Sequence, residues 1–433
     1  MSFVVATFFK RTKIKNAHYI RVKGPVILAM THPNAFMDPI AFTTLVYPPR
    51  VYYLARGDAF KKGIVTILLE SLGIIPIFRI QDGGKEGLKK NDETYERVNA
   101  LLKRRQKIII FAEGLCIQER RLRPLKKGVP RMVFGAMEEY NLSDLTVVPV
   151  GVNYSNPSQF RGSLFYNIGA PLKVADYMKS YAEAPAKTMN QFLADLTPRL
   201  KELIVHINRK ESETVIANME EIYRYDFFKA ENLDTSNLEH DFIFSTKVTE
   251  LVNNAEETHP EKVRVIEEKS SQYLNELKKL GIKDWLLIPE KQKSIHYGNV
   301  LLRLMCIVLS FPLYVRGLLG NYIPYKLTDM ITTKKVRVIE FKASFNIGIG
   351  AIMVLIYYNL QFFIAKALAP NFWWAIAVVV CSFLTGLLCL YLSPFRKKTK
   401  GIYRTVQLKA STPEVFENLS KQRKEIITLF KEL

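Results

Sequence analysis

The chain has 433 residues, with 62 Lys and Arg against 41 Asp and Glu, so its formal net charge is +21. This length leaves room for a domain of roughly 200–250 residues with further elements attached. The basic balance points to an anionic partner, but no zinc spacing, RNP-like motif or aromatic–basic repeat supports nucleic acid. Anionic lipid headgroups are a better candidate for this partner than nucleic acid. The four cysteines form no CxxC pair and the six histidines show no ligand spacing, so we predict no disulfide framework and no metal site.

The chain opens with a short apolar run at residues 1–9, followed by a basic stretch at 10–15. This order is the reverse of a secretory signal. It fits a short interfacial anchor, or an ordinary first strand or helix.

Residues 1–175 alternate strand-like apolar runs with helical segments, which predicts an α/β domain with a mostly parallel sheet flanked by helices. Open sheets of this kind bind ligands at the carboxyl ends of their strands. The predicted strands are Pro25–Met30, Val51–Leu54, Ile74–Phe78, Lys107–Phe111, Val147–Val152 and Leu164–Ile168, and the clearest helices are Asp92–Arg105 and Val129–Tyr140.

Residues 176–297 are helical and highly charged. The clearest helix is Pro260–Leu280, which has Pro near its start and Gly281 just past its end. Its apolar residues form one stripe, interrupted by Ser270, which favours one half of a helical hairpin over a binding surface.

Residues 298–400 form a predicted membrane region. No charged residue occurs between Lys342 and Lys366, or between Lys366 and Arg396. The segments 345–366 and 372–393 are therefore each long enough to cross a hydrocarbon core of about 30 Å, and they are predicted to form a transmembrane hairpin. Basic clusters outside both ends predict that those ends are cytoplasmic.

The segment 300–319 is apolar but carries Arg303 and Arg316, each costing roughly 2.5–3.5 kcal/mol at the bilayer centre. A single crossing there would also place the N-terminal domain and the basic cluster at 334–342 on opposite faces of the membrane. We predict that it lies in the interface or re-enters, with both arginines reaching toward headgroups. An ordinary spanning helix is the alternative. Residues 401–433 are predicted to be a C-terminal cytoplasmic helix.

The most informative stretch is THPNAFMDP, residues 31–39, directly after the first predicted strand. A His and an Asp on a strand-to-helix turn can form a general-base pair, because the carboxylate fixes the tautomer of the imidazole and stabilises the imidazolium. No Ser or Cys nucleophile is needed if the substrate brings a hydroxyl. Asp38 before Pro39 is also typical of a helix N-cap, which would leave His32 an ordinary loop residue, and the two interpretations are compatible.

Four stretches, in order, resemble the four blocks of the glycerolipid acyltransferases, the PlsC-like family. They are THPNAFMDP, Gly73–Arg79, Phe111–Gly114 and Val147–Gly151. Two departures are a spacing of five residues rather than four between the His and the Asp (an HX5D motif), and Ala112 in place of the usual Pro. The longer spacing and the run Pro124–Val129 are similar to the fungal-type glycerol-phosphate acyltransferases, so the chain is nearer that branch.

The resemblance implies acyl transfer from a thioester to an alcohol without a metal or cofactor, with acyl-CoA or acyl carrier protein as the donor substrate. His32 would deprotonate the acceptor hydroxyl and Asp38 would orient His32. Arg79 would bind the acceptor's phosphate, unless it is simply a surface arginine of a basic protein.

The third block supplies further candidates. Glu113, beside Gly114, would hold a glycerol hydroxyl or position a basic group. Its alternative is a helix-start carboxylate near backbone N–H groups. Lys126 and Lys127 are candidates for the same phosphate as Arg79.

The sequence thus predicts a membrane-bound O-acyltransferase of phospholipid biosynthesis, with its catalytic domain on the cytoplasmic side. The acceptor would be glycerol 3-phosphate or 1-acylglycerol 3-phosphate (lysophosphatidate). Alternatives are another lysolipid or lyso-aminolipid as acceptor, or a non-catalytic lipid-binding membrane tether. The partners implied are the lipid bilayer, the acyl donor and the acceptor, with no nucleic acid.

Overall fold

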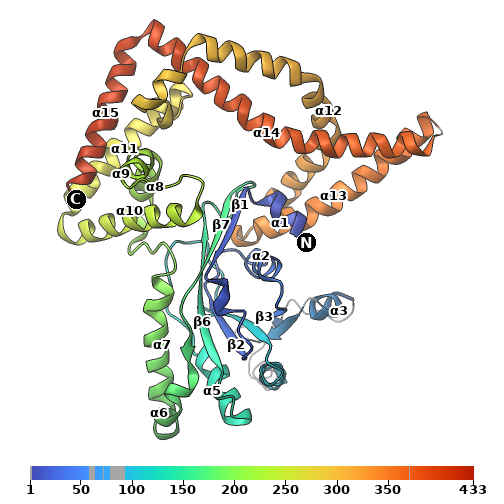
Figure 1. The fold of residues 1–433 in the computed structure, drawn as a ribbon, viewed down its shortest axis with the longest axis vertical. Coiled ribbons are helices and arrows are strands. Elements are labelled where there is room, and N and C mark those ends of the chain that lie inside the picture. The colour runs from blue at the N-terminus through green and yellow to red at the C-terminus, as the bar shows by residue number, and fades with distance from the viewer. Residues whose placement is uncertain (1, 58–63, 72, 79–92, 370) are drawn as a thin grey trace. The chain divides into compact units, whose positions relative to one another are not determined.

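The computed structural model describes residues 2–57, 64–71, 73–78, 93–369 and 371–433 (Figure 1). The chain forms two compact units. Unit 1 comprises Met1–His206 and Val338–Ser344, and unit 2 comprises Ile207–Arg337 and Phe345–Leu433. The chain therefore leaves unit 1 after His206 and returns to it for one short segment.

Unit 1 is built on a mostly parallel sheet, which confirms the predicted fold class. The strand order is β1-β7-β6-β2-β5-β3-β4, with β8 also paired to β6. The pairs that β6 makes with β7 and β8 are antiparallel, and the other described pairs are parallel. The strands are β1 (Arg11–Lys15), β2 (Val26–Met30), β3 (Val51–Arg56), β4 (Ile74–Ile77), β5 (Lys107–Phe111), β6 (Thr146–Tyr154), β7 (Ser163–Ile168) and β8 (Leu172–Lys173).

Helices cover both faces of this sheet (Figure 1). On one face the core includes Phe134 and Phe192, which pack with the strand residues Ile27 and Ile110. Every residue of β2 is buried, so the loop that follows it starts from a fixed point. The helices are α1 (Ser2–Phe8), α2 (Met37–Val46), α3 (Ile64–Ser71), α5 (Gly128–Tyr140), α6 (Met178–Glu183) and α7 (Pro185–Lys201), with a further helical stretch at 93–103.

The shorter helices of unit 2 form a bundle with its own hydrophobic core. Helix α11 has the predicted bounds, and its apolar stripe is buried from Val263 to Leu277, including Ser270 at the interruption, while Leu280 at its end is partly buried. Arg423 links separate elements of the bundle, because its guanidinium donates to Asp284 at 2.9 Å and to Asp226 at 2.7 Å. The helices are α8 (Glu213–Ile222), α9 (Arg224–Ala230), α10 (Leu238–Thr258), α11 (Pro260–Leu280) and α15 (Pro413–Lys431).

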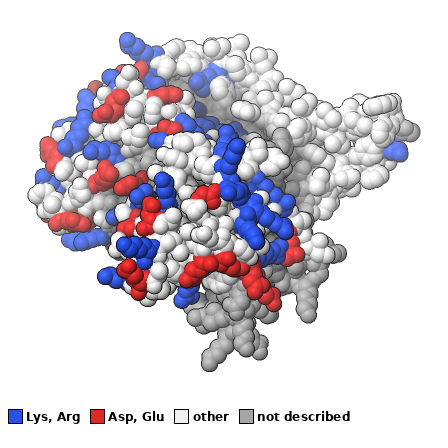
Figure 2. All heavy atoms as spheres, turned by 60° about the horizontal axis from the view of Figure 1, so that its bottom comes forward, with Lys and Arg blue, Asp and Glu red and all other residues white. Residues whose placement is uncertain are grey.

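Three more helices are long and apolar enough to cross a membrane, judged by length and composition: α12 (Tyr297–Lys335), α13 (Ile339–Leu368) and α14 (Phe372–Ser411). Of these, α12 and α14 lie in unit 2, and α13 begins in unit 1 and continues in unit 2. Figure 2 shows the projection that α13 and α14 form as almost uniformly uncharged surface. The single helix predicted for 401–433 is instead the end of α14 followed by α15. Pro413 begins α15, because proline fits the first turn of a helix but interrupts a continuous one.

Candidate active site

The loop between β2 and α2 brings the two residues of the HX5D motif together. His32 follows β2, Asp38 lies in the first turn of α2, and His32 Nδ1 is 2.9 Å from Asp38 Oδ2. In the tautomer that carries its proton on Nδ1, this contact is a hydrogen bond from His32 to Asp38, and Nε2 is then the nitrogen that can accept a proton. The longer spacing is therefore compatible with a His–Asp pair.

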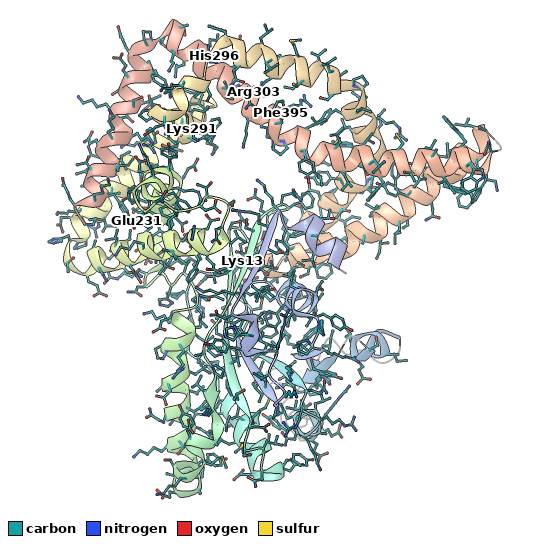
Figure 3. The ribbon with its side chains drawn as sticks, in the orientation of Figure 1. Lys13, Glu231, Lys291, His296, Arg303 and Phe395 are labelled. Atoms are coloured by element: carbon teal, nitrogen blue, oxygen red, sulfur yellow. The ribbon has the colours of Figure 1, made fainter. Side chains whose placement is uncertain are left out.

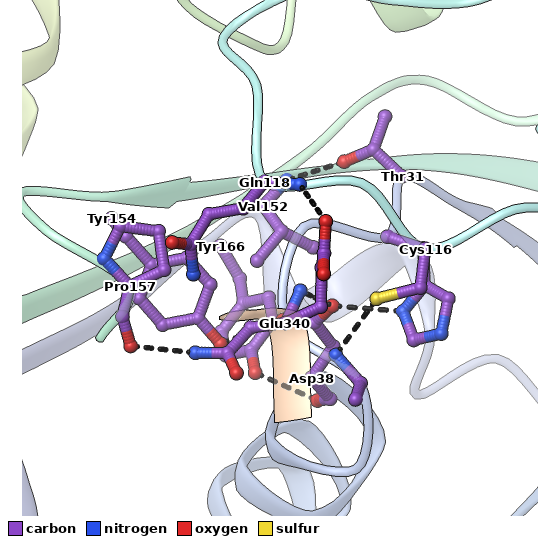
Figure 4. Close-up of polar contacts among 12 residues, drawn as sticks. Thr31, Asp38, Cys116, Gln118, Val152, Tyr154, Pro157, Tyr166 and Glu340 are labelled. Atoms are coloured by element: carbon purple, nitrogen blue, oxygen red, sulfur yellow. Dashed lines mark hydrogen bonds and ion pairs between the residues drawn. The ribbon is translucent and has the colours of Figure 1, made fainter. Parts of the chain in front are cut away.

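Asp38 is fully buried and is held by several donors (Figure 4). Besides His32, its Oδ2 accepts the backbone N–H of Asn34 at 2.8 Å, and its Oδ1 accepts the hydroxyl of Tyr154 at 2.6 Å. The hydroxyl of Tyr166 donates to the Asp38 backbone carbonyl at 2.8 Å. Burial, reinforced by the Asp38 charge, raises the pKa of Tyr154 and of Tyr166 well above 10, so both phenols remain protonated donors.

The interpretation of Asp38 as a helix N-cap is wrong. The N-cap of α2 is Phe36, and no side chain caps that end. The Asp38 carboxylate faces back into the preceding loop, where it binds Asn34 and His32. Asp38 is therefore a hydrogen-bond partner of His32 rather than a helix cap.

The His32 ring is fixed from its face as well as its edge. It stacks on the ring of Phe111 with centroids 3.6 Å apart and planes 13° from parallel. Phe111 ends β5, whose register pairs it with Met30 at the end of β2. The parallel sheet thus brings the first and third blocks together, and the 15% exposure of the His32 side chain leaves it accessible to a substrate.

Glu113 lies beside this pair but does not start a helix, so that alternative is wrong. Its carboxylate accepts the backbone N–H of Arg123 at 2.9 Å. Burial raises the pKa of Glu113, and the backbone N–H groups of Arg123 and His32 oppose that rise. Glu113 therefore ties the segment before α5 to the loop that carries His32.

Comparison with known proteins places this loop within an acyltransferase domain. Residues 11–153 match the family model described as Acyltransferase. The chain is 31% identical over 111 residues to "Glycerol-3-phosphate O-acyltransferase 2" of Saccharomyces cerevisiae, an alignment covering 25% of this chain and 15% of that protein. It is 26% identical over 136 residues to "Glycerol-3-phosphate O-acyltransferase 1" of the same yeast, covering 31% and 18%. The domain belongs to the glycerolipid acyltransferase family.

Two further similarities are more distant. An uncharacterized acyltransferase of Schizosaccharomyces pombe is 21% identical, over 45% of this chain and 41% of that protein. The crystal structure of the 1-acyl-sn-glycerophosphate acyltransferase PlsC from Thermotoga maritima has a TM-score of 0.29 and 14% identity, over 45% of this chain and 76% of that one. The chain spans less than half the length of each of these yeast relatives.

The remaining predicted residues of the acyltransferase domain are placed as follows. Gly114 has a φ of +65°, and a side chain there would approach Lys126 Cγ to 3.0 Å. The Lys126 N–H donates to the Ala112 carbonyl at 2.8 Å, and Lys127 is the N-cap of α5. Both lysines are exposed beside the third block. Arg79 lies outside the described residues.

Several residues near the pair carry no signal in the sequence. Ala35 N–H donates to Cys116 Sγ at 3.0 Å, and burial raises the pKa of that thiol, so it stays protonated and is not a nucleophile. Glu340, from the segment that returns to unit 1, accepts the Gln118 N–H at 3.3 Å (Figure 4). Among the described residues, no group of three or more His, Cys, Asp or Glu could hold a metal ion.

Proposed function

We propose that the protein is a membrane-bound O-acyltransferase that acylates glycerol 3-phosphate or 1-acylglycerol 3-phosphate for phospholipid synthesis. The acyl donor would be acyl-CoA or acyl carrier protein. The observation that carries this proposal is the 2.9 Å contact between His32 and a fully buried Asp38, within a glycerolipid acyltransferase domain. The helices α12, α13 and α14 support residence in a membrane, and a cytosolic donor favours a cytoplasmic catalytic domain.

In this mechanism His32 Nε2 takes the proton of the acceptor hydroxyl as its oxygen attacks the thioester carbonyl. Asp38 stabilises the imidazolium that forms, and a positioned base of this kind contributes about 10²–10⁴-fold. When the tetrahedral intermediate collapses, the C–S bond breaks and the imidazolium returns the proton to the leaving thiolate. The products are an ester and a free thiol.

The phosphate of the acceptor would be held by basic residues of the second and third blocks. Lys126 and Lys127 precede the N-terminus of α5, whose partial positive charge favours an anion. Arg79 would add a planar, bidentate donor. Arg79→Lys is therefore expected to raise KM for the phosphorylated acceptor much more than KM for the acyl donor. Equal effects on both would make Arg79 structural.

Purified protein in detergent should be given labelled acyl-CoA, or labelled acyl carrier protein, with a panel of acceptors. Labelled ester is expected with glycerol 3-phosphate or its 1-acyl derivative, and not with the His32→Ala variant purified in parallel. Ester formed only on a lysolipid or lyso-aminolipid lacking a phosphate monoester would change the acceptor class. Transfer to no acceptor from either donor would favour the non-catalytic tether.

A further inference from the structure

The place of α12 in the chain limits which faces of a membrane its two ends can lie on. The chain leaves unit 1 after His206 and re-enters it at Val338. Residues 207–337 are all described, and among them α12 is the one candidate membrane span. A single crossing would place two parts of unit 1 on opposite faces of the bilayer. We propose that α12 is a re-entrant membrane helix, which enters and leaves on the face of unit 1.

The contacts of α12 with the α13–α14 hairpin show how far each part of α12 lies from the hairpin turn. The Arg303 guanidinium lies 5.0 Å from the centre of the Phe395 ring (Figure 3). Further along, the Cys389 thiol lies 3.5 Å from the Tyr314 carbonyl oxygen. Measured along α14 from Asn371, at the hairpin turn, Phe395 is about 36 Å away and Cys389 about 27 Å, at a rise of about 1.5 Å per residue. The first arm of α12 therefore runs toward the turn.

The direction then reverses. Gln361 Nε2 donates to the Gly320 carbonyl at 3.0 Å, and Gln361 is only about 12 Å of helix from Ala369 at the turn. Beyond Gly320, Thr328 Cγ2 is 3.6 Å from the position that a Cβ on Gly350 would occupy. Gly350 is about 28 Å of helix from Ala369. The second arm of α12 therefore runs away from the turn along α13, so α12 reaches its greatest depth near Gly320.

The sequence explains how one helix can turn back. Pro312 and Pro324 lie inside α12 on either side of its deepest point. Each removes a backbone hydrogen bond and disturbs the preceding turn, which bends a helix. Figure 1 shows α12 strongly bent rather than straight.

Polar groups hold the deepest part of α12 against the hairpin. Arg316 Nη2 donates to Ser382 Oγ at 2.8 Å and to the Val378 carbonyl at 3.1 Å, so Arg316 does not reach toward headgroups as predicted. Asn321 Nδ2 donates to the Ser382 carbonyl at 2.9 Å, and the Tyr358 hydroxyl donates to Asn321 Oδ1 at 2.7 Å. Polar side chains at such depth persist when they are paired in this way.

The first arm of α12 presents apolar side chains to its surroundings. Leu302, Met305, Leu309 and Phe311 are 54–79% exposed. At about 100° per residue they point in more than one direction, whereas a surface helix of a soluble protein has a single apolar stripe. This surface is continuous with a hairpin of membrane-spanning length, so its occupant is the hydrocarbon of the bilayer.

Sidedness can be tested with single cysteines in a variant lacking Cys116, Cys306, Cys381 and Cys389. Lys293→Cys, Thr333→Cys and Asn371→Cys would be reconstituted into sealed vesicles and treated with a membrane-impermeant maleimide, with and without permeabilising detergent. Labelling of 293 and 333 from one face, and of 371 from the other, is expected. Labelling of 293 and 333 from opposite faces would overturn the proposal, and so would labelling of 371 from their face.

Depth provides an independent test. A fluorophore on Leu319→Cys is expected to be quenched most by lipids brominated deep in the acyl chain. The matched fluorophore on Leu301→Cys, at the start of the first arm, should be quenched most by lipids brominated near the headgroup. Equal depths, or the reverse order, would contradict a helix that dips into the bilayer and returns.

Discussion

Tyr154→Phe removes one hydrogen bond to Asp38 and almost nothing else. The phenol donates to Asp38 Oδ1 at 2.6 Å, and the carboxylate is fully buried, so water cannot easily replace the lost donor. A hydrogen bond to a charged group contributes about 1.5–3 kcal/mol. If that energy is used to orient His32 in the transition state, turnover should fall about 10- to 100-fold, at about 1.4 kcal/mol per tenfold.

The assay is steady-state acyl transfer with the donor and the acceptor varied in turn. An orienting role predicts that kcat falls while KM for each substrate changes by less than about threefold, because the Tyr154 hydroxyl would act through Asp38. Tyr177→Phe is the matched control, since it removes a phenol–carboxylate bond of 2.7 Å to Asp195 outside the site. Wild-type kcat for Tyr154→Phe, or an equal loss for Tyr177→Phe, would refute the reasoning.

Three further predictions concern charge. Asp38→Asn should lower kcat by about 10³–10⁴-fold, since the amide no longer fixes the productive tautomer of His32. Asp144→Asn, the control, should not lower kcat. Equal activity of the two variants would exclude a catalytic role for the His32–Asp38 pair. Burial, with nearby cations, lowers the pKa of His206 to about 4 from 6.5. As the pH falls, the unfolded state then binds the proton before the folded state does, so stability to denaturant should decline from pH 6.5 to pH 4. The upper bound of this decline is about 3.4 kcal/mol, and solvent screening at the partly exposed ring reduces it. His206→Leu should remove the dependence. Arg423→Met should lower the free energy of unfolding by about 3–5 kcal/mol by leaving the buried Asp284 carboxylate without its cation, and adding Asp284→Asn should restore most of it.

The strands that carry the four blocks could be predicted because they are apolar and buried. β2 is buried at all five positions and β5 at four of five, so their sequences are continuous apolar runs. β1 could not be predicted, because Arg11–Lys15 is a half-buried edge strand rich in Lys and Arg. Charges on an edge strand protect it from pairing with other chains, and in the sequence they are indistinguishable from those of a basic loop.

The candidate site, too, has a part that could be predicted from the sequence and a part that could not. His32 and Asp38 are close in the chain, so local spacing was enough to predict their contact. Tyr154 and Tyr166 meet Asp38 across 116 and 128 residues, and Glu340 meets Gln118 across 222. Contacts of that kind depend on how distant segments pack together in the folded chain, and no local pattern encodes them.

The most direct test of the proposed function is acyl transfer by His32→Ala. Single-turnover transfer from labelled acyl-CoA to glycerol 3-phosphate, or to its 1-acyl derivative, would be compared for wild type, His32→Ala and His18→Ala. His18 is an exposed histidine of unit 1 whose ring is tilted by 48° against that of Tyr19, and it serves as the matched control. We expect His32→Ala to react at least about 100-fold more slowly, with unchanged folding and membrane insertion, and His18→Ala to match wild type. Transfer by His32→Ala at a rate near that of wild type would contradict the mechanism.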